Sequence, residues 1–315
     1  SHPLHSFSEA STLPKEMRTA LDALGSSVLH VSEERVARDG TTKFLLEGHD
    51  GAALEAVFMP YSERATACIS SQVGCPVGCA FCATGAMGLK RNLSAAEIVD
   101  QVRALNICAA GQGQRLSNLV YMGMGEPLLN LRAVLDSVRI ITDPLGFGLS
   151  HRAISISTVG IPAGIRTLAR EEPQVNLAIS LHASDDRTRA ALIPRTFCHP
   201  LSQVLDAAWE HFALTGRKVL VEYVLLQGVN DSLDDARRLA GLLRGHVVTV
   251  NLIAWNPARL LRTGSHRRPL EETDGPVSFR SPSPAAVAAF REALSAAHIE
   301  AVVRRSKGGG IDAAC

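Results

Sequence analysis

From about residue 64 onward, short runs of apolar and β-branched residues alternate with longer stretches in which apolar residues recur at helical spacing. The apolar runs predict strands at residues 67–72, 118–122, 152–157, 176–181, 219–225, 247–252 and 299–304. The stretches between them predict helices at residues 94–109, 130–142, 162–170, 201–213, 232–243 and 284–297. This alternation is typical of α/β proteins whose parallel sheet is either open or closed into a full or partial barrel.

The first 62 residues follow a different pattern. Apolar positions at helical spacing predict a helix over residues 8–25, and two short runs at 43–46 and 54–58 predict a pair of strands joined by a turn. We therefore expect an N-terminal accessory region, residues 1–62, and a core domain, residues 63–315.

Glycines and polar residues gather where the predicted strands end. A cysteine-rich loop follows the first strand, and Gly123–Glu126 follow the second. Ser157 ends the third strand, Ser180–His182 end the fourth, and Asn256 comes shortly after the sixth. Because the carboxyl ends of parallel strands meet at one edge of the sheet, where ligands bind, we expect these residues to form one site.

Composition narrows the class of protein. The 315 residues carry a formal net charge of +1, so no global basic field indicates a polyanionic partner. Aromatic residues make up only 4%, which argues against an extensive stacking surface for single-stranded nucleic acid. No run approaches the roughly 18 apolar residues of a membrane span, and the first residues do not resemble a secretory signal. We expect a cytoplasmic protein that is not bound to a membrane.

The cysteine-rich loop carries the clearest chemical signal. Cys75, Cys79 and Cys82 have the spacing C-x3-C-x2-C, and thiolates are the usual ligands of iron–sulfur clusters. Three thiolates leave one iron of a four-iron cluster without a protein ligand, so that iron can bind a substrate. A zinc site is the alternative, but zinc ligands recur as a second pair, which the sequence lacks.

This loop, with an aromatic residue before its last cysteine, resembles the signature of the radical S-adenosylmethionine (SAM) superfamily. Seven segments further resemble the RlmN/Cfr family of RNA adenine methyltransferases, and RlmN most of all. They are Cys68–Cys75, Phe81–Gly85, Arg91–Leu93, Met122–Asn130, Ser180–Ala183, Asn251–Pro257 and Ile311–Cys315.

The resemblance implies a partial (β/α) TIM-like barrel of the radical SAM type with a small N-terminal extension. Its cofactors would be a [4Fe–4S] cluster on Cys75, Cys79 and Cys82, and two molecules of SAM per turnover. The residues that match the family's SAM contacts are Gly125, Glu126, Ser157, Ser180, Leu181, His182 and Asn256.

The resemblance also assigns three catalytic roles. Cys315 matches the cysteine that first accepts a methyl group from SAM, and a 5′-deoxyadenosyl radical from a second SAM then activates that S-methyl group. The resulting methylene adds to an adenine ring carbon. Glu55 matches the general base that removes the ring proton, and Cys68 matches the thiol that releases the product through a transient disulfide with Cys315.

The implied activity is methylation of C2 of an adenine in 23S rRNA, with tRNA as a further substrate. Alternatives are C8 methylation of rRNA, as in the antibiotic-resistance enzyme Cfr, a radical SAM enzyme acting on a substrate other than RNA, and a non-catalytic metal-binding RNA module. Expected partners are RNA and a flavodoxin-type electron donor. The accessory region would be a shortened RNA-binding part.

Basic residues near the chain end predict where RNA would lie. Arg304–Lys307 precede Cys315 directly, so phosphate contacts there would position RNA beside the terminal thiol. Arg187, Arg189, Arg195 and residues 259–268, the basic part of a loop predicted over residues 257–284, would extend this basic surface.

Overall fold

A single curved sheet of ten strands organises the computed structural model, which describes residues 7–24, 27–194, 196–256, 279–304, 307–308 and 310–311. The strands, in their order across the sheet, are β1 (Leu29–Val36), β2 (Thr42–Gly48), β3 (Ala53–Pro60), β4 (Ala65–Cys68), β7 (Leu116–Tyr121), β8 (Ile154–Thr158), β9 (Asn176–Ser180), β10 (Val219–Leu225), β11 (Val248–Ala254) and β12 (Glu300–Val303). From β4 to β12 every neighbouring pair is parallel, as the alternating pattern predicts. This is a mixed α/β fold with a mostly parallel sheet, consistent with a partial barrel.

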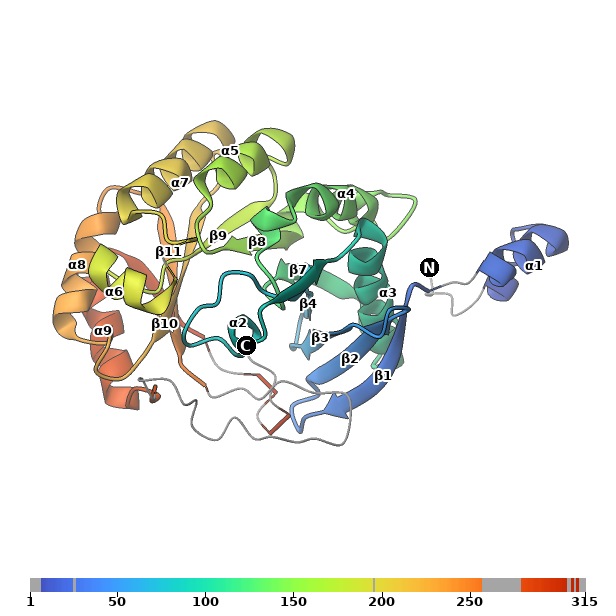
Figure 1. Cartoon of the computed structure of the whole chain (residues 1–315), viewed down its shortest axis with the longest axis horizontal. Coiled ribbons are helices and arrows are strands. Elements are labelled where there is room, and N and C mark those ends of the chain that lie inside the picture. The colour runs from blue at the N-terminus through green and yellow to red at the C-terminus, as the bar shows by residue number, and fades with distance from the viewer. Residues whose placement is uncertain are drawn as a thin grey trace.

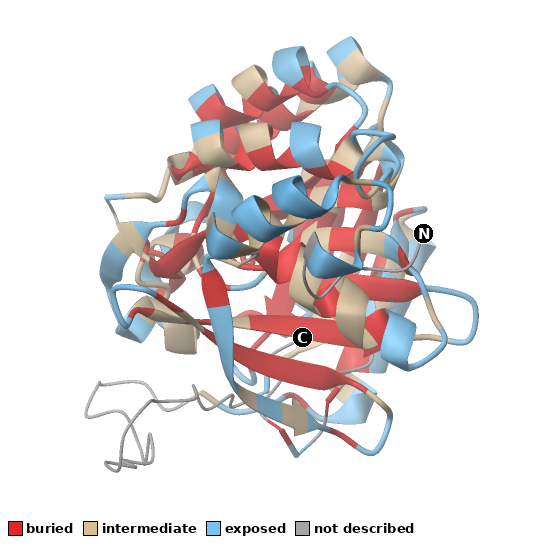
Figure 2. Cartoon of the chain, turned by 90° about the vertical axis from the view of Figure 1, so that its right-hand side faces the viewer, coloured by how far each residue is buried: buried red, intermediate tan, exposed pale blue. Residues whose placement is uncertain are grey.

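Helices cover the outer side of the curve (Figure 1). They are α3 (Ala95–Gly111), α4 (Leu131–Thr142), α5 (Pro162–Glu171), α6 (Asp186–Leu192), α7 (Leu201–Thr215), α8 (Leu233–Leu243) and α9 (Pro284–Ala296). Short turns add η1 (Phe7–Glu9), α2 (Ala83–Ala86), η2 (Pro127–Leu129) and η3 (His151–Ala153). Figure 2 shows that the central strands of the sheet are mostly buried while the outer faces of the helices are exposed. Within the described residues, no helix has the length and apolar character needed to cross a membrane.

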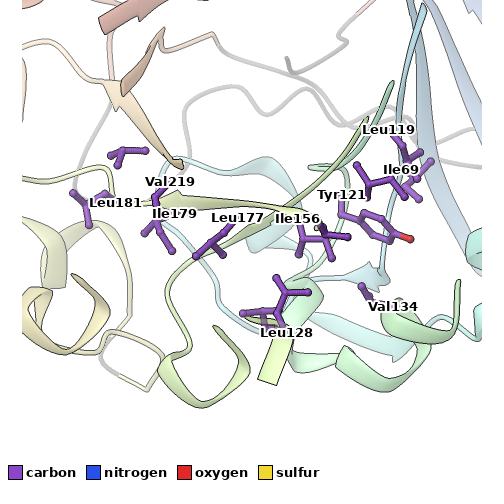
Figure 3. Close-up of a cluster of buried hydrophobic side chains, with 14 of the residues drawn as sticks. Ile69, Leu119, Tyr121, Leu128, Val134, Ile156, Leu177, Ile179, Leu181 and Val219 are labelled. Atoms are coloured by element: carbon purple, nitrogen blue, oxygen red, sulfur yellow. The ribbon is translucent and has the colours of Figure 1, made fainter. Parts of the chain in front are cut away.

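The main core lies between the sheet and these helices. Every second residue of a strand points outward, so Leu119, Tyr121 and Ile156 pack toward Leu128 and Val134 (Figure 3). The residues that alternate with them face the inside of the curve. That inner face carries the polar residues described below.

The N-terminal strands extend the barrel sheet. β1, β2 and β3 form an antiparallel meander, and β3 pairs antiparallel with β4, so hydrogen bonding continues across residue 62. Val57 lies directly opposite Cys68 in this pairing. The accessory region therefore contributes the inner-face residues of β3 to the same surface as the barrel.

Three local predictions differ from the structure. The predicted helix 8–25 is shorter, because α1 (Lys15–Leu24) begins only after Pro14, a residue suited to the start of a helix. The predicted strand 67–72 is divided: β4 ends at Cys68, and β5 (Gln72–Gly74) pairs instead with β6 (Leu89–Asn92). The strand β1 is missed, because it lies at the edge of the sheet and its exposed polar residues break the strand pattern.

Candidate active site

The cysteine loop lies between β5 and β6. These two strands pair antiparallel and so hold the two ends of the loop together. Gly74 has φ +78°, and a Cβ there would lie 1.9 Å from the carbonyl oxygen of Gly88. The N–H of Cys75 donates to that same oxygen over 3.0 Å. Only glycine fits the start of the loop, because any side chain would collide with rigid backbone.

The three cysteines lie on this loop with partly buried side chains. Burial, together with the neighbouring thiol of Cys82, raises the pKa of Cys75 to about 11. Burial, followed by Cys82 and Cys75, also raises the pKa of Cys79. Three thiols that influence one another in this way are close in space, and without a cation they are unfavourable as thiolates. A bound metal centre supplies the positive charge that removes this penalty.

The loop is held against the barrel by contacts behind the cysteines. The Nε1–H of Trp255 donates to the carbonyl of Phe81 over 3.1 Å, and the N–H of Ala80 donates to the carbonyl of Leu192 over 2.9 Å. The Phe81 ring meets the edge of His182 at a centroid distance of 4.9 Å. The loop therefore lies next to the carboxyl ends of the strands, where the other predicted site residues sit.

Glu126 is a buried carboxylate in the loop after β7, directly before η2. Its Oε1 accepts from the N–H of Leu128 over 3.0 Å, and its Oε2 accepts from the N–H of Val159 over 2.7 Å. Burial raises its pKa to about 7, although these hydrogen bonds and one from Thr158 oppose the shift. Beside it, Gly125 has φ +101° and a Cβ there would lie 2.6 Å from Gln72 Cβ. The backbone can follow this path only with glycine.

Ser157 and Ser180 come from neighbouring strands, β8 and β9, and their hydroxyl oxygens lie 3.0 Å apart. Next along the chain, Leu181 is fully buried, and its N–H donates to the carbonyl of Glu222 over 3.0 Å. His182 has φ +58° and accepts from the N–H of Val224 at Nδ1 over 3.1 Å. Burial lowers the pKa of His182 to about 3, so its imidazole is neutral at physiological pH.

A second group of predicted residues lies on the inner face of β3 and β4. Because Val57 opposes Cys68 and Glu55 precedes Val57 by two residues, Glu55 and Cys68 share this face. Glu55 forms an ion pair with Lys43, whose side chain is 0% exposed, at a distance of 2.9 Å. This pair fixes the direction of the carboxylate. Cys68 is buried with Val57 and Met59 in a small apolar cluster.

The C-terminal tail reaches this same cluster. Ile311 is buried against the residues around Cys68, four positions before Cys315. Lys307 holds the tail at the end of β3: its Nζ donates to the carbonyl of Pro60 over 3.0 Å and lies 4.7 Å from the centre of the Tyr61 ring. Cys315 itself lies outside the described residues.

Comparison with known proteins identifies the family. The model of the radical SAM superfamily matches residues 69–240. The chain is 46% identical over 314 residues to the dual-specificity RNA methyltransferase RlmN of Syntrophobacter fumaroxidans, covering 99% of this chain and 86% of that protein. It is 44% identical over 310 residues to a probable RlmN of Thermus thermophilus, covering 98% and 83%. The chain belongs to the RlmN family of radical SAM methyltransferases.

A crystal structure of a radical SAM methyltransferase from Sphaerobacter thermophilus supports the assignment. It matches with a TM-score of 0.90 and 42% sequence identity, over 99% of this chain and 87% of that one. The predicted family, fold class and enzyme type are thus confirmed. As a radical SAM enzyme, this protein uses a [4Fe–4S] cluster and SAM as cofactors.

The residues of this RlmN-family enzyme fit those cofactors. Three thiols that influence one another's pKa values, on one loop that begins at Gly74, supply the number of ligands required by a cluster that keeps one iron for SAM. Glu126, the Ser157–Ser180 pair and His182 stand at the adjoining strand ends. Asn256, the last predicted SAM contact, follows β11 and is exposed.

One prediction about the basic surface is wrong, the exposure of Arg189. Arg189 is fully buried, with its guanidinium donating to the carbonyls of Val159 and His199, so it does not contact RNA from the surface. Arg189 lies on α6, which packs against the cysteine loop through the hydrogen bond from the N–H of Ala80 to the carbonyl of Leu192. The sequence pattern does not reveal this packing. Lys307 makes the tail contacts described above. Arg195 and the greater part of the predicted loop, residues 257–278, lie outside the described residues.

Sequence reasoning missed several supporting residues. Gln72 accepts from the N–H of Glu126 over 2.8 Å, and Lys43 pairs with Glu55. The sequence offered one signal for these supporting residues: Lys43 stands next to the apolar residues of β2. A lysine that is buried with them requires a partner of opposite charge. Backbone donors such as Val159 carry no sequence signal at all.

Proposed function

We propose that this enzyme methylates an adenine ring carbon of RNA, with C2 of an adenine in 23S rRNA as the favoured target and tRNA as a further substrate. The observation that carries the proposal is the contact of Ile311 with the apolar cluster around Cys68. Four residues of extended chain span at most about 14 Å, so Cys315 stays within that distance of Ile311. The two thiols that the reaction requires are therefore within reach of each other.

Each residue has a defined task in this proposal. The cluster and SAM, when bound, supply the methyl group and the one-electron chemistry that activates it. Cys315 carries the methyl-derived carbon to the adenine, Glu55 removes the ring proton, and Cys68 attacks the Cys315 sulfur to release the product. Lys43 keeps the Glu55 carboxylate in position. Burial of Cys68 limits its contact with other oxidants and thiols.

The choice of C2 over C8 rests on the relatives. The ending Ile311–Cys315 resembles RlmN, and the relatives of 44% to 46% identity carry that name. C8 methylation, as by Cfr, remains the alternative within the same chemistry. A cytoplasmic location and a flavodoxin-type electron donor complete the proposal.

Nucleoside analysis of rRNA and tRNA from a strain that lacks the gene tests the proposal. We expect 2-methyladenosine to be absent, and to return with the wild-type gene but not with Cys315→Ala. Appearance of 8-methyladenosine in the complemented strain would contradict the C2 assignment. Unchanged methyladenosine in both RNAs would contradict the function itself.

A further inference from the structure

Glu222 is a charged residue in the middle of β10, a strand of a parallel sheet. Its neighbours Val221 and Tyr223 point outward into the main core, so Glu222 points to the inner face of the curve. In the register of the sheet it lies beside Ser180 of β9 on one side and Asn251 of β11 on the other. Glu222 is neither a predicted SAM contact nor a predicted catalytic residue.

The carboxylate of Glu222 is buried and only half satisfied. The residue is 3% exposed, and its Oε1 accepts from Asn251 Nδ2 over 2.8 Å. Its Oε2 is buried without a hydrogen-bond partner in the described part of the chain. Burial raises the pKa of Glu222, opposed by the Asn251 hydrogen bond and the charge of Arg304. A buried acceptor without a donor is unfavourable for folding alone, so it calls for a ligand that supplies one.

The surroundings define where that ligand lies. Ser157, Ser180, Glu222 and Asn251 form a continuous polar row across four neighbouring strands, starting from the pair of serine hydroxyls 3.0 Å apart. The main chain is linked too, because the N–H of Leu181 donates to the carbonyl of Glu222. The row therefore extends the site that receives SAM in this family toward β11.

We propose that Glu222 accepts hydrogen bonds from the hydroxyl groups of a bound ribose. An ionised carboxylate offers only acceptors, and a vicinal diol offers two donors of matching spacing, as in dinucleotide sites where an acidic residue binds the ribose 2′-hydroxyl. Two molecules in this reaction carry a ribose: SAM and the target nucleotide. The SAM case rests on the cofactor alone, whereas the nucleotide case also rests on the proposed function.

The test compares ligands and variants in the anaerobically reconstituted enzyme. Binding of SAM and of its 2′-deoxy analogue is measured for the wild type, Glu222→Met and Glu222→Gln. If SAM supplies the ribose, the wild type binds SAM about tenfold more tightly than the 2′-deoxy analogue. Glu222→Met then binds SAM about tenfold more weakly than the wild type and no longer distinguishes the two ligands. The affinity of Glu222→Gln for SAM lies between those of the wild type and Glu222→Met. Glu300→Gln is the control, because Glu300 is an exposed glutamate near the same strands, paired with Lys218, and should leave SAM binding unchanged.

The second arm uses an RNA fragment with or without a single 2′-deoxyadenosine at the target position. If the target nucleotide supplies the ribose, SAM binding is the same in all variants, and the wild-type preference for the ribose-containing RNA disappears in Glu222→Met. Equal preferences in the wild type and Glu222→Met for both ligand pairs would overturn the proposal. A failure of RNA methylation with an intact SAM arm would contradict the proposed function and leave this inference standing.

A thermal melt separates a ligand role from a structural one. Glu222→Met removes a buried, half-satisfied carboxylate, so we expect the SAM-free variant to melt at the same temperature as the wild type or higher. A lower melting temperature would indicate that the carboxylate serves the fold, and would also overturn the proposal. The wild-type comparison of SAM with its 2′-deoxy analogue needs no variant, so it decides the SAM arm even if a variant fails to fold.

Discussion

Glu126 illustrates how a residue can suit a ligand at the expense of the fold. Its carboxylate is buried and receives backbone hydrogen bonds from Leu128 and Val159, yet burial still raises its pKa to about 7. In the unfolded chain its pKa is near the ordinary value of 4.5. Folding therefore favours the protonated form, and ionisation destabilises the fold unless a cationic group of a ligand is present.

The pH dependence of stability follows from this shift. Between pH 4.5 and 7 the unfolded state loses the proton first, so the stability of the wild type falls as pH rises and the penalty is complete above pH 7. Glu126→Gln removes the penalty, but its amide nitrogen cannot accept the backbone hydrogen bond that one carboxylate oxygen receives, which costs stability equally at every pH. In urea unfolding of the SAM-free, cluster-free protein, we therefore expect the stability of the variant relative to the wild type to rise by about 3 kcal/mol between pH 4.5 and pH 8. A relative stability that stays the same between these pH values would refute this account.

Gly74, in contrast to Glu126, is required by the backbone geometry and not by a ligand. We expect Gly74→Ala to lose most of its iron after reconstitution, because the methyl group would displace the backbone that closes the cysteine loop. Gly111→Ala is the control: Gly111 ends helix α3, and a Cβ there meets nothing within 4 Å. Iron content and cluster absorbance are the measurements. Full iron in Gly74→Ala would show that the loop tolerates the change.

At the scale of elements, the C-terminal tail depends on the N-terminal strands. Lys307 contacts Pro60 and Tyr61 at the turn after β3, and the N–H of Gly308 donates to Asp39 at the turn after β1 over 3.3 Å. These contacts position Ile311 beside Cys68. The accessory region thus provides the surface on which the tail rests, whatever else it does.

Loss of this anchor should slow the approach of the two thiols. A hydrogen bond from an ammonium and a cation–π contact together contribute about 2 kcal/mol, so we expect Lys307→Met to form the Cys68–Cys315 disulfide at least about tenfold more slowly with diamide. Lys218→Met, which removes an exposed ion pair with Glu300, is the matched control. Equal rates in the two variants would mean that Lys307 does not position the tail. Peptide mapping by mass spectrometry follows the disulfide.

At the scale of the whole molecule, the cluster loop and the barrel core are largely separate. Cys75 and Cys79 border a small apolar cluster with Val77, whereas the main core lies between the sheet and the outer helices. We therefore expect that the fold does not depend on metal in the way that small zinc domains do.

Removal of the three cysteines that we expect to hold the cluster should leave the barrel intact. We expect Cys75→Ala, Cys79→Ala and Cys82→Ala combined to keep the circular dichroism of the metal-free wild type and to melt within about 5 °C of it. Iron binding should be lost completely. A protein that unfolds without these cysteines would show that the loop supports the core.

The sequence by itself determined the alternation of the main strands and helices from β7 onward, though not β1 or α6, and it indicated the chemistry of the cysteine loop. Both are local signals: periodicity reports which face of an element is buried, and closely spaced thiols report a metal site. Family motifs added the SAM contacts and the roles of Glu55, Cys68 and Cys315 as predictions. The structure places Glu55 and Cys68 on one face of the sheet.

Only the tertiary structure decided how distant residues meet. The unpaired oxygen of Glu222, the burial of Arg189 and the contact of Ile311 with the Cys68 cluster all depend on which strands and turns lie side by side. A lone glutamate in a strand or a lysine in a tail looks the same in sequence whether it faces solvent or a partner. Burial and pairing are properties of the packed molecule, because they are set by residues far apart along the chain.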